Sequence, residues 1–474
     1  MAGCWAHVPS SSVAKSVSAP ADTTVVSWPG VLVSWTPFDP LELASDSIDL
    51  LGFLKPYLAL VDRFLPGLTT VTSTPRYVPM LCAAIAAATG VEPERGELAT
   101  KVRERRLEAV LSYERAWALA CALSGKRGSV EGLLGIRSVN HRLAQRAVQE
   151  KSIRTNSFQM LSRQVRYGGL GIYGTLLEAS HVAVTTELKL RPAGEDLAAA
   201  FSHPPDALHV CDPRANLSLD TLAEWGKEAH PARMSPGEAK LLRRALSGGD
   251  ETESADQVRW SALRILARYR DADEAALLQR IYRDLCSGAF DGMQLPSECL
   301  DQIRAVLVVV EPFESFYQTG LFLFQTLRAE ATQCGTADLE AVVGKTRRRE
   351  ALRKARFAGK KLLSVLDGLA EPAIIQAFCD SGVSKLAQDL SKSPEDEILP
   401  TLVRRHTMVQ AGKFDGSLPK GPWIRLNDGG DAVVLTAQRY QLPMQDAPTA
   451  PKDVSRHPYR THSAYRFIRQ CGIH

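Results

Sequence analysis

The chain has few of the features that mark an enzyme. Its 474 residues contain no GxSxG nucleophile turn, no phosphate-binding P-loop, no HExxH zinc helix and no paired-carboxylate signature. The acid pairs Asp271/Asp273 and Asp396/Glu397 stand at expected helix starts, where capping and the helix dipole explain them. The sequence therefore favours a non-enzymatic protein, and the enzymatic alternative is a metal-dependent nuclease assembled from distant acids.

Cysteine motifs and long apolar runs are also missing. The nine cysteines include no CxxC pair, so neither a zinc site nor a disulfide framework is predicted. The loop residues His203, His209, Cys211 and Asp212 are spaced too irregularly to predict a metal site. The longest apolar run, Val78 to Ala88, is too short to span a bilayer, and the N-terminus lacks a secretory signal. We expect a cytoplasmic protein with no cofactor, no metal and no membrane contact.

Two other patterns have structural explanations. Gly169, Gly171 and Gly174 satisfy GxGxxG, but the preceding segment is polar and helical in pattern rather than a strand. We interpret these glycines as a turn that lets two helices pack closely. His406 follows two arginines and is expected on a basic helix face, and His457 is expected in a packed, hydrogen-bonded tail.

Positive charge, in contrast, is concentrated in one stretch of the chain. Residues 345–361 read KTRRREALRKARFAGKK, with nine basic residues and Glu350 as the only acid. Nine minus one leaves +8 here, and because the whole chain carries +4, the remainder carries about −4. Concentrated positive charge is typical of proteins that bind phosphate backbones.

On a helical wheel this stretch has an apolar face and two rows of cations. The apolar face comprises Leu352, Ala355, Gly359, Leu362, Leu363 and Leu366. One row contains Arg349, Arg353, Arg356 and Lys360, and the other contains Arg347, Lys354 and Lys361. We predict that the helix packs through its apolar face while the cations contact nucleic acid. The alternatives are an acidic partner protein and an ordinary solvated surface.

A second basic region supports the first. Between residues 137 and 166 seven basic residues face Glu150 alone, a net charge of +6. The candidate nucleic-acid contacts here are Arg137, Arg142, Arg146, Arg163 and Arg166. Two clusters on separate segments favour a shared electropositive surface, provided that the fold brings them together.

The same region has the element order of a winged helix. Helices are predicted over 140–150, 156–167 and 172–180, followed by a strand pair over 182–190 and a helix that begins at Pro192. A winged helix can place its third helix in the major groove. The third helix here is poor in base-reading side chains, so we expect recognition of backbone or shape rather than of sequence.

The predicted fold class is mainly α, with this winged-helix-like module and a small C-terminal β-hairpin. We predict an extended N-terminal arm (1–40), a helical domain (41–128), the winged-helix-like module (129–201), a second helical domain (202–335) and a final region (336–474). That region contains the basic helix, further helices, and a hairpin formed by WIRL, the turn NDGGD and AVVLT. Residues 305–310 are predicted as a strand or a buried helical turn.

Several segments resemble uncharacterised bacterial proteins that are encoded near phage-defence genes. They are RFLPGLTTVTSTPRYVPMLCAAI (63–85), RYGGLGIYGTLLEA with LRPAGEDLAAAF, and the late VRRHTMVQAGKFDG, KGPWI and HPYR. The resemblance implies one subunit of a multi-component anti-phage system and transfers no active-site residue. Together with the charge pattern it predicts a non-enzymatic nucleic-acid-binding subunit, with DNA as ligand and other protein subunits as partners.

Overall fold

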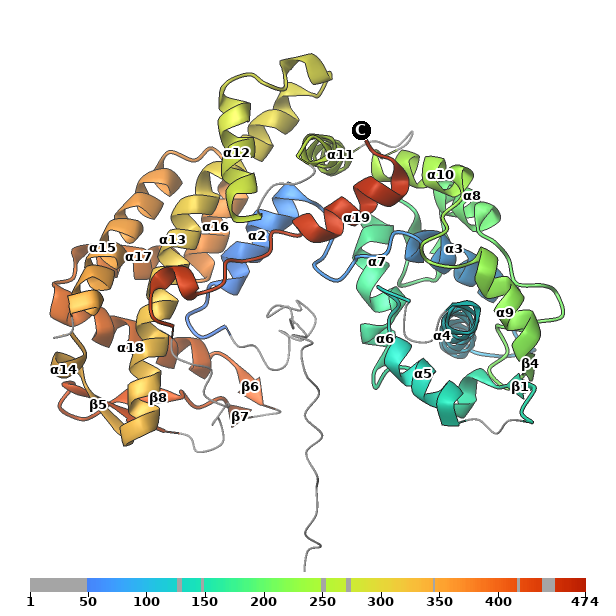
Figure 1. Cartoon of the computed structure of the whole chain (residues 1–474), viewed down its shortest axis with the longest axis horizontal. Coiled ribbons are helices and arrows are strands. Elements are labelled where there is room, and N and C mark those ends of the chain that lie inside the picture. Colours follow the sequence, from blue (N-terminus) through green and yellow to red (C-terminus); the bar gives the residue numbers. More distant parts are fainter. Residues whose placement is uncertain are drawn as a thin grey trace, which may run out of the picture. The chain divides into compact units, whose positions relative to one another are not determined.

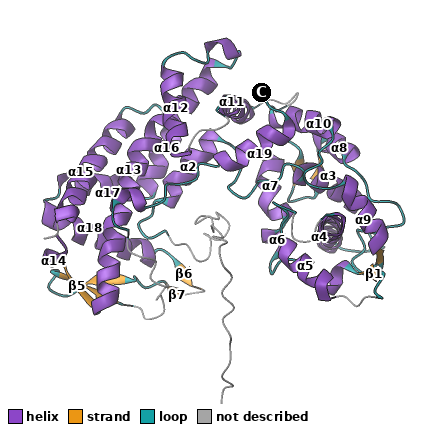
Figure 2. Cartoon of the chain, in the orientation of Figure 1, coloured by secondary structure: helices purple, strands orange, loops and turns teal. Residues whose placement is uncertain are grey.

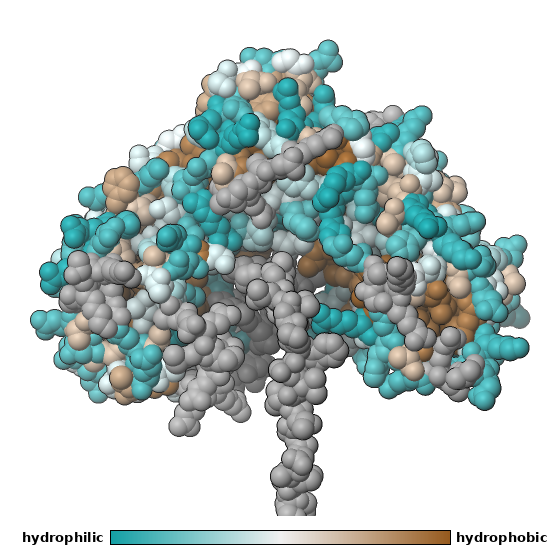
Figure 3. Space-filling model, viewed as in Figure 1, coloured by the Kyte–Doolittle hydropathy of each residue, from teal (hydrophilic) through white to brown (hydrophobic). Residues whose placement is uncertain are grey.

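The computed structural model describes residues 49–125, 130–145, 149–248, 253–269, 274–343, 346–415, 418–436 and 448–474. These residues form a mainly helical protein with a few small antiparallel sheets, as the sequence predicted (Figures 1 and 2). Hydrophilic side chains cover much of the face seen in Figure 3, with apolar patches between them. None of the described helices is both long enough and apolar enough to cross a membrane. The predicted N-terminal arm lies outside the described residues.

The helices of the first half of the described chain are α2 (Leu54–Phe64), α3 (Tyr77–Thr89), α4 (Ala99–Ser124), α5 (Ile136–Gln145), α6 (Gln164–Tyr167), α7 (Gly169–Ala179), α8 (Pro192–Ala200), α9 (Leu219–Glu228), α10 (Pro236–Leu246) and α11 (Ser254–Ala267), with a 3-10 turn at Thr155–Ser157. Helices α3, α5 and α9 pack on α4, and α3 packs on α8, whereas α2 packs on α11, α13 (Ser297–Cys334) and α16 (Pro372–Asp380). The buried Trp117 of α4 donates its indole N–H to the Ala229 carbonyl over 2.8 Å, which fixes α4 to the end of α9.

The helices of the second half are α12 (Glu274–Cys286), α13 (Ser297–Cys334), α14 (Leu339–Val343), α15 (Thr346–Asp367), α16 (Pro372–Asp380), α17 (Val383–Lys392), α18 (Glu395–Ala411) and α19 (Thr461–Cys471), with 3-10 turns at Asp291–Met293 and Pro451–Asp453. Most of the second half packs around the long helix α13, whereas its last helix, α19, packs on α10 and α11. Helix α13 contacts α2, α11, α12, α15 and α18. Residues 305–310 lie inside α13, so the helical alternative holds for this apolar run rather than the strand.

The strands are short and antiparallel. Pairs form between β1 (Ser152–Ile153) and β4 (Leu217–Ser218), β2 (Ala183–Val184) and β3 (Lys189–Leu190), and β6 (Phe414–Asp415) and β7 (Leu418–Pro419). The predicted C-terminal hairpin is confirmed as β8 (Ile424–Leu426) and β9 (Ala432–Leu435), in which Ile424 pairs with Leu435. The structure adds β5 (Thr336–Asp338) to its other edge, so the order is β5-β9-β8. This third strand pairs across almost a hundred residues of chain, which local patterning does not reveal.

Charged groups in the first half are buried in pairs. Arg76 at the start of α3 lies 3.1 Å from Glu238 of α10, and both side chains are almost fully buried. Nη1 of Arg76 donates to the carbonyls of Glu228 and His230 over 2.6 and 2.7 Å, and Nη2 donates to the Ser202 hydroxyl over 3.2 Å. A buried ion pair offsets its desolvation only when such additional hydrogen bonds are made. Here one guanidinium joins α3, α9 and α10.

The winged-helix interpretation of residues 129–201 is not confirmed. The predicted first helix is shifted to Ile136–Gln145, and of the predicted second helix only Gln164–Tyr167 is α-helical. The strand pair and the closing helix are present. The third helix, α7, packs one face into the core, with Ile172 and Leu176 buried, and leaves Thr175 and Glu178 exposed on the other.

The N-terminus of α7 is also turned inward. The Gly169 N–H donates to the buried Glu114 carboxyl over 2.6 Å, and Gln164 donates to the same carboxyl over 2.8 Å. Burial raises the pKa of Glu114, an effect that these two hydrogen bonds only partly oppose. A Cβ on Gly169 would come within 2.9 Å of the Tyr77 ring, so this glycine does allow close helix packing. The exposed face of α7 carries Thr175 and Glu178 and no cation, so it has no basic side chain to place in a DNA groove.

Candidate nucleic-acid interface

Helix α15 is held by its apolar face, as the wheel predicted. It packs on α13 and α17, and Leu352, Ala355, Leu362 and Leu366 are buried. A Cβ on Gly359 would lie only 2.9 Å from the Ala387 carbonyl of α17, so glycine is needed where the two helices approach each other. Because several apolar side chains of α15 are buried against these two helices, α15 is firmly packed. The side chains on its other face therefore project from a fixed backbone.

The cations of α15 point away from that core. The described basic side chains are exposed at Arg349, Arg353, Lys354, Lys360 and Lys361, and half-buried at Arg356. The side chain of Arg347 lies outside the described residues. Between residues 349 and 361 six cations accompany one acid, so this face carries a net charge of +5.

Few of these cations are neutralised by neighbours. Lys354 lies 2.7 Å from Glu350, which lowers the pKa of that carboxyl, and Arg353 lies 3.9 Å from Glu395 at the start of α18. Exposed pairs of this kind are weak and leave the charge available to a stronger ligand. The remaining four make no ion pair or hydrogen bond with the described part of the chain; they are Arg349, Arg356, Lys360 and Lys361.

One residue of this face was missed by the sequence analysis. Phe357 is 70% exposed, and it is the only aromatic among the large exposed apolar residues of the described chain. It lies opposite the buried face, between the two rows of cations. The sequence contained a signal for this residue, because Phe357 is a single aromatic that falls outside the apolar face of a predicted basic helix.

A groove of about 330 Å³ borders α15 on the Lys354 side. Glu350 and Lys354 line it from the helix, and Lys452 lines it from the 3-10 turn near the C-terminus. The groove therefore brings one further cation to the edge of the α15 face from a segment about a hundred residues away.

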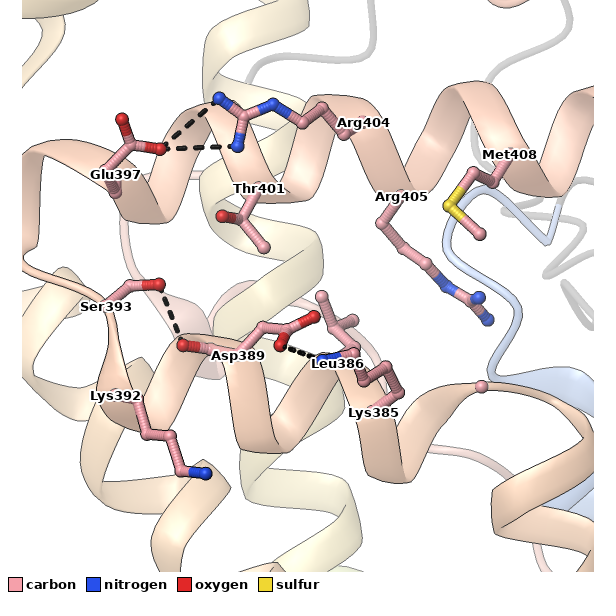
Figure 4. Close-up of a pocket in the computed structure, with 11 residues that line it drawn as sticks. Lys385, Leu386, Asp389, Lys392, Ser393, Glu397, Thr401, Arg404, Arg405 and Met408 are labelled. Carbon is pink, nitrogen blue, oxygen red and sulfur yellow. Dashed lines mark hydrogen bonds and ion pairs between the residues drawn. The ribbon is translucent and has the colours of Figure 1, made fainter.

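A larger groove of about 510 Å³ lies between α17 and α18, shown in Figure 4. Two of its four cations are paired, because Lys385 bonds Asp389 over 2.7 Å and Arg404 bonds Glu397 over 3.3 Å, which leaves Lys392 and Arg405 and a net charge of +2. Arg405 is turned to backbone carbonyls, one of them that of Leu51 at 2.9 Å. The net charge of +5 on the α15 face thus exceeds the +2 of this groove.

The second basic region is dispersed by comparison. Arg137 and Arg163 are exposed, whereas Arg142 is paired with Glu150 over 2.9 Å and the Arg166 guanidinium lies 5.4 Å from the Tyr167 ring centre. Arg146 lies outside the described residues. Helix α5 packs on α4 and helix α6 packs on α7, whereas α15 packs on α13 and α17. The two basic regions thus belong to different groups of helices.

Arg163 and Arg166 nevertheless line a common depression. It has a volume of about 390 Å³, and Arg115 of α4 is the third cation at its edge. No acid lines this depression in the described chain. Arg115, however, is bonded to Glu108 over 2.9 Å and to Gln164 over 2.7 Å, so its charge is already engaged.

Two histidines singled out in the sequence, His406 and His457, are buried. His406 is fully buried, and its ring bonds the Leu50 carbonyl at 2.9 Å and the Trp423 N–H at 3.0 Å. Burial lowers its pKa to about 4, so His406 is neutral and does not belong to a basic face, contrary to the prediction. His457 is packed and bonded to Glu314 over 2.8 Å, as predicted for the tail.

The loop at 203–212 forms no metal centre. Across the described ranges, no group of three His, Cys, Asp or Glu side chains is arranged to hold an ion.

No family model, no curated protein and no solved structure matches this chain.

Proposed function

We propose that this protein is a non-enzymatic nucleic-acid-binding subunit whose main contact is the exposed face of α15. The observation that carries the proposal is the set of six cations on one firmly packed helix, four of them without a partner in the described chain. Unpaired cations repel one another, and this repulsion is relieved when phosphates replace their counterions. Side chains on a packed helix are already positioned, so binding orders little additional backbone.

The resemblance to bacterial proteins encoded near phage-defence genes supports a role as one subunit of a defence complex. Such a subunit would need weak sequence preference, because phage sequences vary. The face of α15 fits this requirement, since contacts to phosphates position a protein without reading bases. DNA is the proposed ligand, and further protein subunits are the proposed partners.

The test is fluorescence anisotropy of labelled duplex DNA, single-stranded DNA and RNA with the purified protein between about 50 and 200 mM salt. If the six cations of α15 each neutralise one duplex phosphate, log Kd against log salt has a slope of magnitude about 5. Labelled poly-glutamate of similar length serves as the acidic-protein probe. Absence of nucleic-acid binding at the lowest salt, with tight binding of poly-glutamate, would replace this proposal by docking to an acidic partner.

A further inference from the structure

Phe357 has a cation at each of the four positions that neighbour it on the surface of α15. Helix neighbours lie three and four residues away in each direction. Before Phe357 these positions hold Arg353 and Lys354, and after it they hold Lys360 and Lys361. Each lies about 4.5–6 Å from Phe357 along the helix axis. No other large exposed apolar residue of the described chain has cations at all four positions.

The Phe357 ring has no partner ring or cation in the part of the chain that the structure describes, although such contacts occur elsewhere, for example Arg328 over Trp423 at 5.2 Å. An exposed phenylalanine at 70% keeps most of its apolar surface in water at a free-energy cost. One isolated exposed apolar residue is ordinary, but one placed at the centre of a cationic face provides a flat apolar surface where a phosphate-bearing ligand would lie.

Resting on the proposed function, we propose that α15 binds single-stranded nucleic acid, with one unpaired base stacked on Phe357 and the phosphates on either side of it held by the four surrounding cations. Proteins that bind single strands combine a cationic track with aromatic platforms, because every base has a π-face. A duplex keeps its bases stacked on each other, so it could offer the ring only base edges in a groove.

The local charges fit a strand better than an acidic protein segment. A single strand has a phosphate on either side of each base, and α15 has cations on either side of its one aromatic ring. The nearest acid on the helix, Glu350, is two turns before Phe357 and is held by Lys354 at 2.7 Å. The ring itself therefore has no negative neighbour within one helical turn.

The test compares the affinity of the whole protein for three probes. They are a labelled DNA strand of about 16 nucleotides, the same strand with abasic residues in place of the bases, and the corresponding duplex. Phe357→Ala is expected to weaken binding of the base-bearing strand about 5- to 150-fold, which is the range for loss of one base stack. Binding of the abasic strand and the salt slope should stay as in the wild type, because no cation is lost.

Two further variants separate stacking from apolar contact. Phe357→Trp should keep or improve binding of the base-bearing strand, whereas Phe357→Leu, which is apolar but has no π-face, should lose most of it. Met408→Ala is the matched control, because Met408 is 67% exposed on α18 and has cations only at Arg404 and Arg405. It should change none of the three affinities.

The outcomes distinguish this inference from the proposed function. If the wild type binds nucleic acid but Phe357→Ala lowers the affinities for base-bearing strand, abasic strand and duplex equally, or lowers none, the stacking inference is wrong and phosphate binding remains. If the wild type binds none of the probes at about 50 mM salt, both are wrong.

Discussion

The exposed face of α15 and the buried charges around α3 use the same residue types in opposite ways. On α15, Lys360 and Lys361 stand in solvent without partners in the described chain. Near α3, Arg76 is buried against Glu238 at 3.1 Å and donates to two backbone carbonyls through Nη1. A paired, buried cation contributes to the specificity of the fold, whereas an unpaired row at the surface contributes little to folding. The difference indicates which charges are available to a ligand.

The largest expected effect comes from removing the longer row of α15. We expect the combined Arg349, Arg353, Arg356 and Lys360 to Gln variant to weaken duplex binding about 10³-fold near 150 mM salt. The salt slope should decrease by about 0.9 for each lost phosphate contact. Anisotropy titrations at several salt concentrations measure both quantities.

The control for this variant is its stability. Chemical denaturation should show a change of about 1 kcal/mol or less in the free energy of unfolding, because the apolar face is intact and surface substitutions have small effects. Unchanged affinity together with an unchanged slope would remove α15 from the binding surface.

Glu238→Gln should have the opposite pattern, with a large effect on stability and none on nucleic-acid affinity. Removing the acid leaves the Arg76 charge buried without its counter-charge, so we expect a loss of about 3–5 kcal/mol in the free energy of unfolding. Nucleic-acid affinity at a temperature where the variant is folded should be unchanged. Asp301→Asn, which breaks the exposed pair with Arg304, is the matched control and should have little effect on either quantity. A stable Glu238→Gln protein would show that the pair contributes little to folding.

His406 supplies a pH dependence of stability. Its pKa is lowered to about 4 in the folded protein, against about 6.5 when unfolded, so the unfolded state binds more protons between these values. Stability from this residue is complete above pH 6.5 and is lost as pH falls toward 4, by roughly 3 kcal/mol in total.

The test is to measure the free energy of unfolding of the wild type and of His406→Gln by denaturation at pH 7 and at several acidic pH values. The difference in unfolding free energy between the two proteins should shrink as pH falls. A difference that stays constant over this range would show that His406 titrates normally in the folded state.

The smallest effect is expected for the second basic region. Arg137→Gln with Arg163→Gln should weaken duplex binding at most about 30-fold near 150 mM salt, since two contacts at most are removed. The neighbouring Arg142 is already paired with Glu150, so Arg142→Gln serves as the control and should change affinity less than either exposed arginine. A loss as large as that of the α15 variant would make both regions equal parts of one surface.

The helix predicted over 156–167 shows where local patterning fails. Residues 158–163 are not helical in the structure. The side chain of Gln164 is drawn inward to the Leu111 carbonyl and to Glu114, and Thr155 is buried within 2.7 Å of the Ser112 hydroxyl. These contacts with α4 are absent from any local sequence window, so the sequence indicated helix where tertiary hydrogen bonds fix an irregular segment.

The sequence by itself determined the basic helix, its buried face and its rows of cations, because all three follow from a period of 3.6 residues within one segment. It also determined the β8–β9 hairpin through the turn NDGGD. Only the tertiary structure decided that the N-terminus of α7 is turned to the buried Glu114, that His406 is neutral and that Arg142 is paired. Those properties depend on which distant segments pack together. The free energy of a charged group is set mainly by the residues that surround it in space, and sequence neighbours are only some of these.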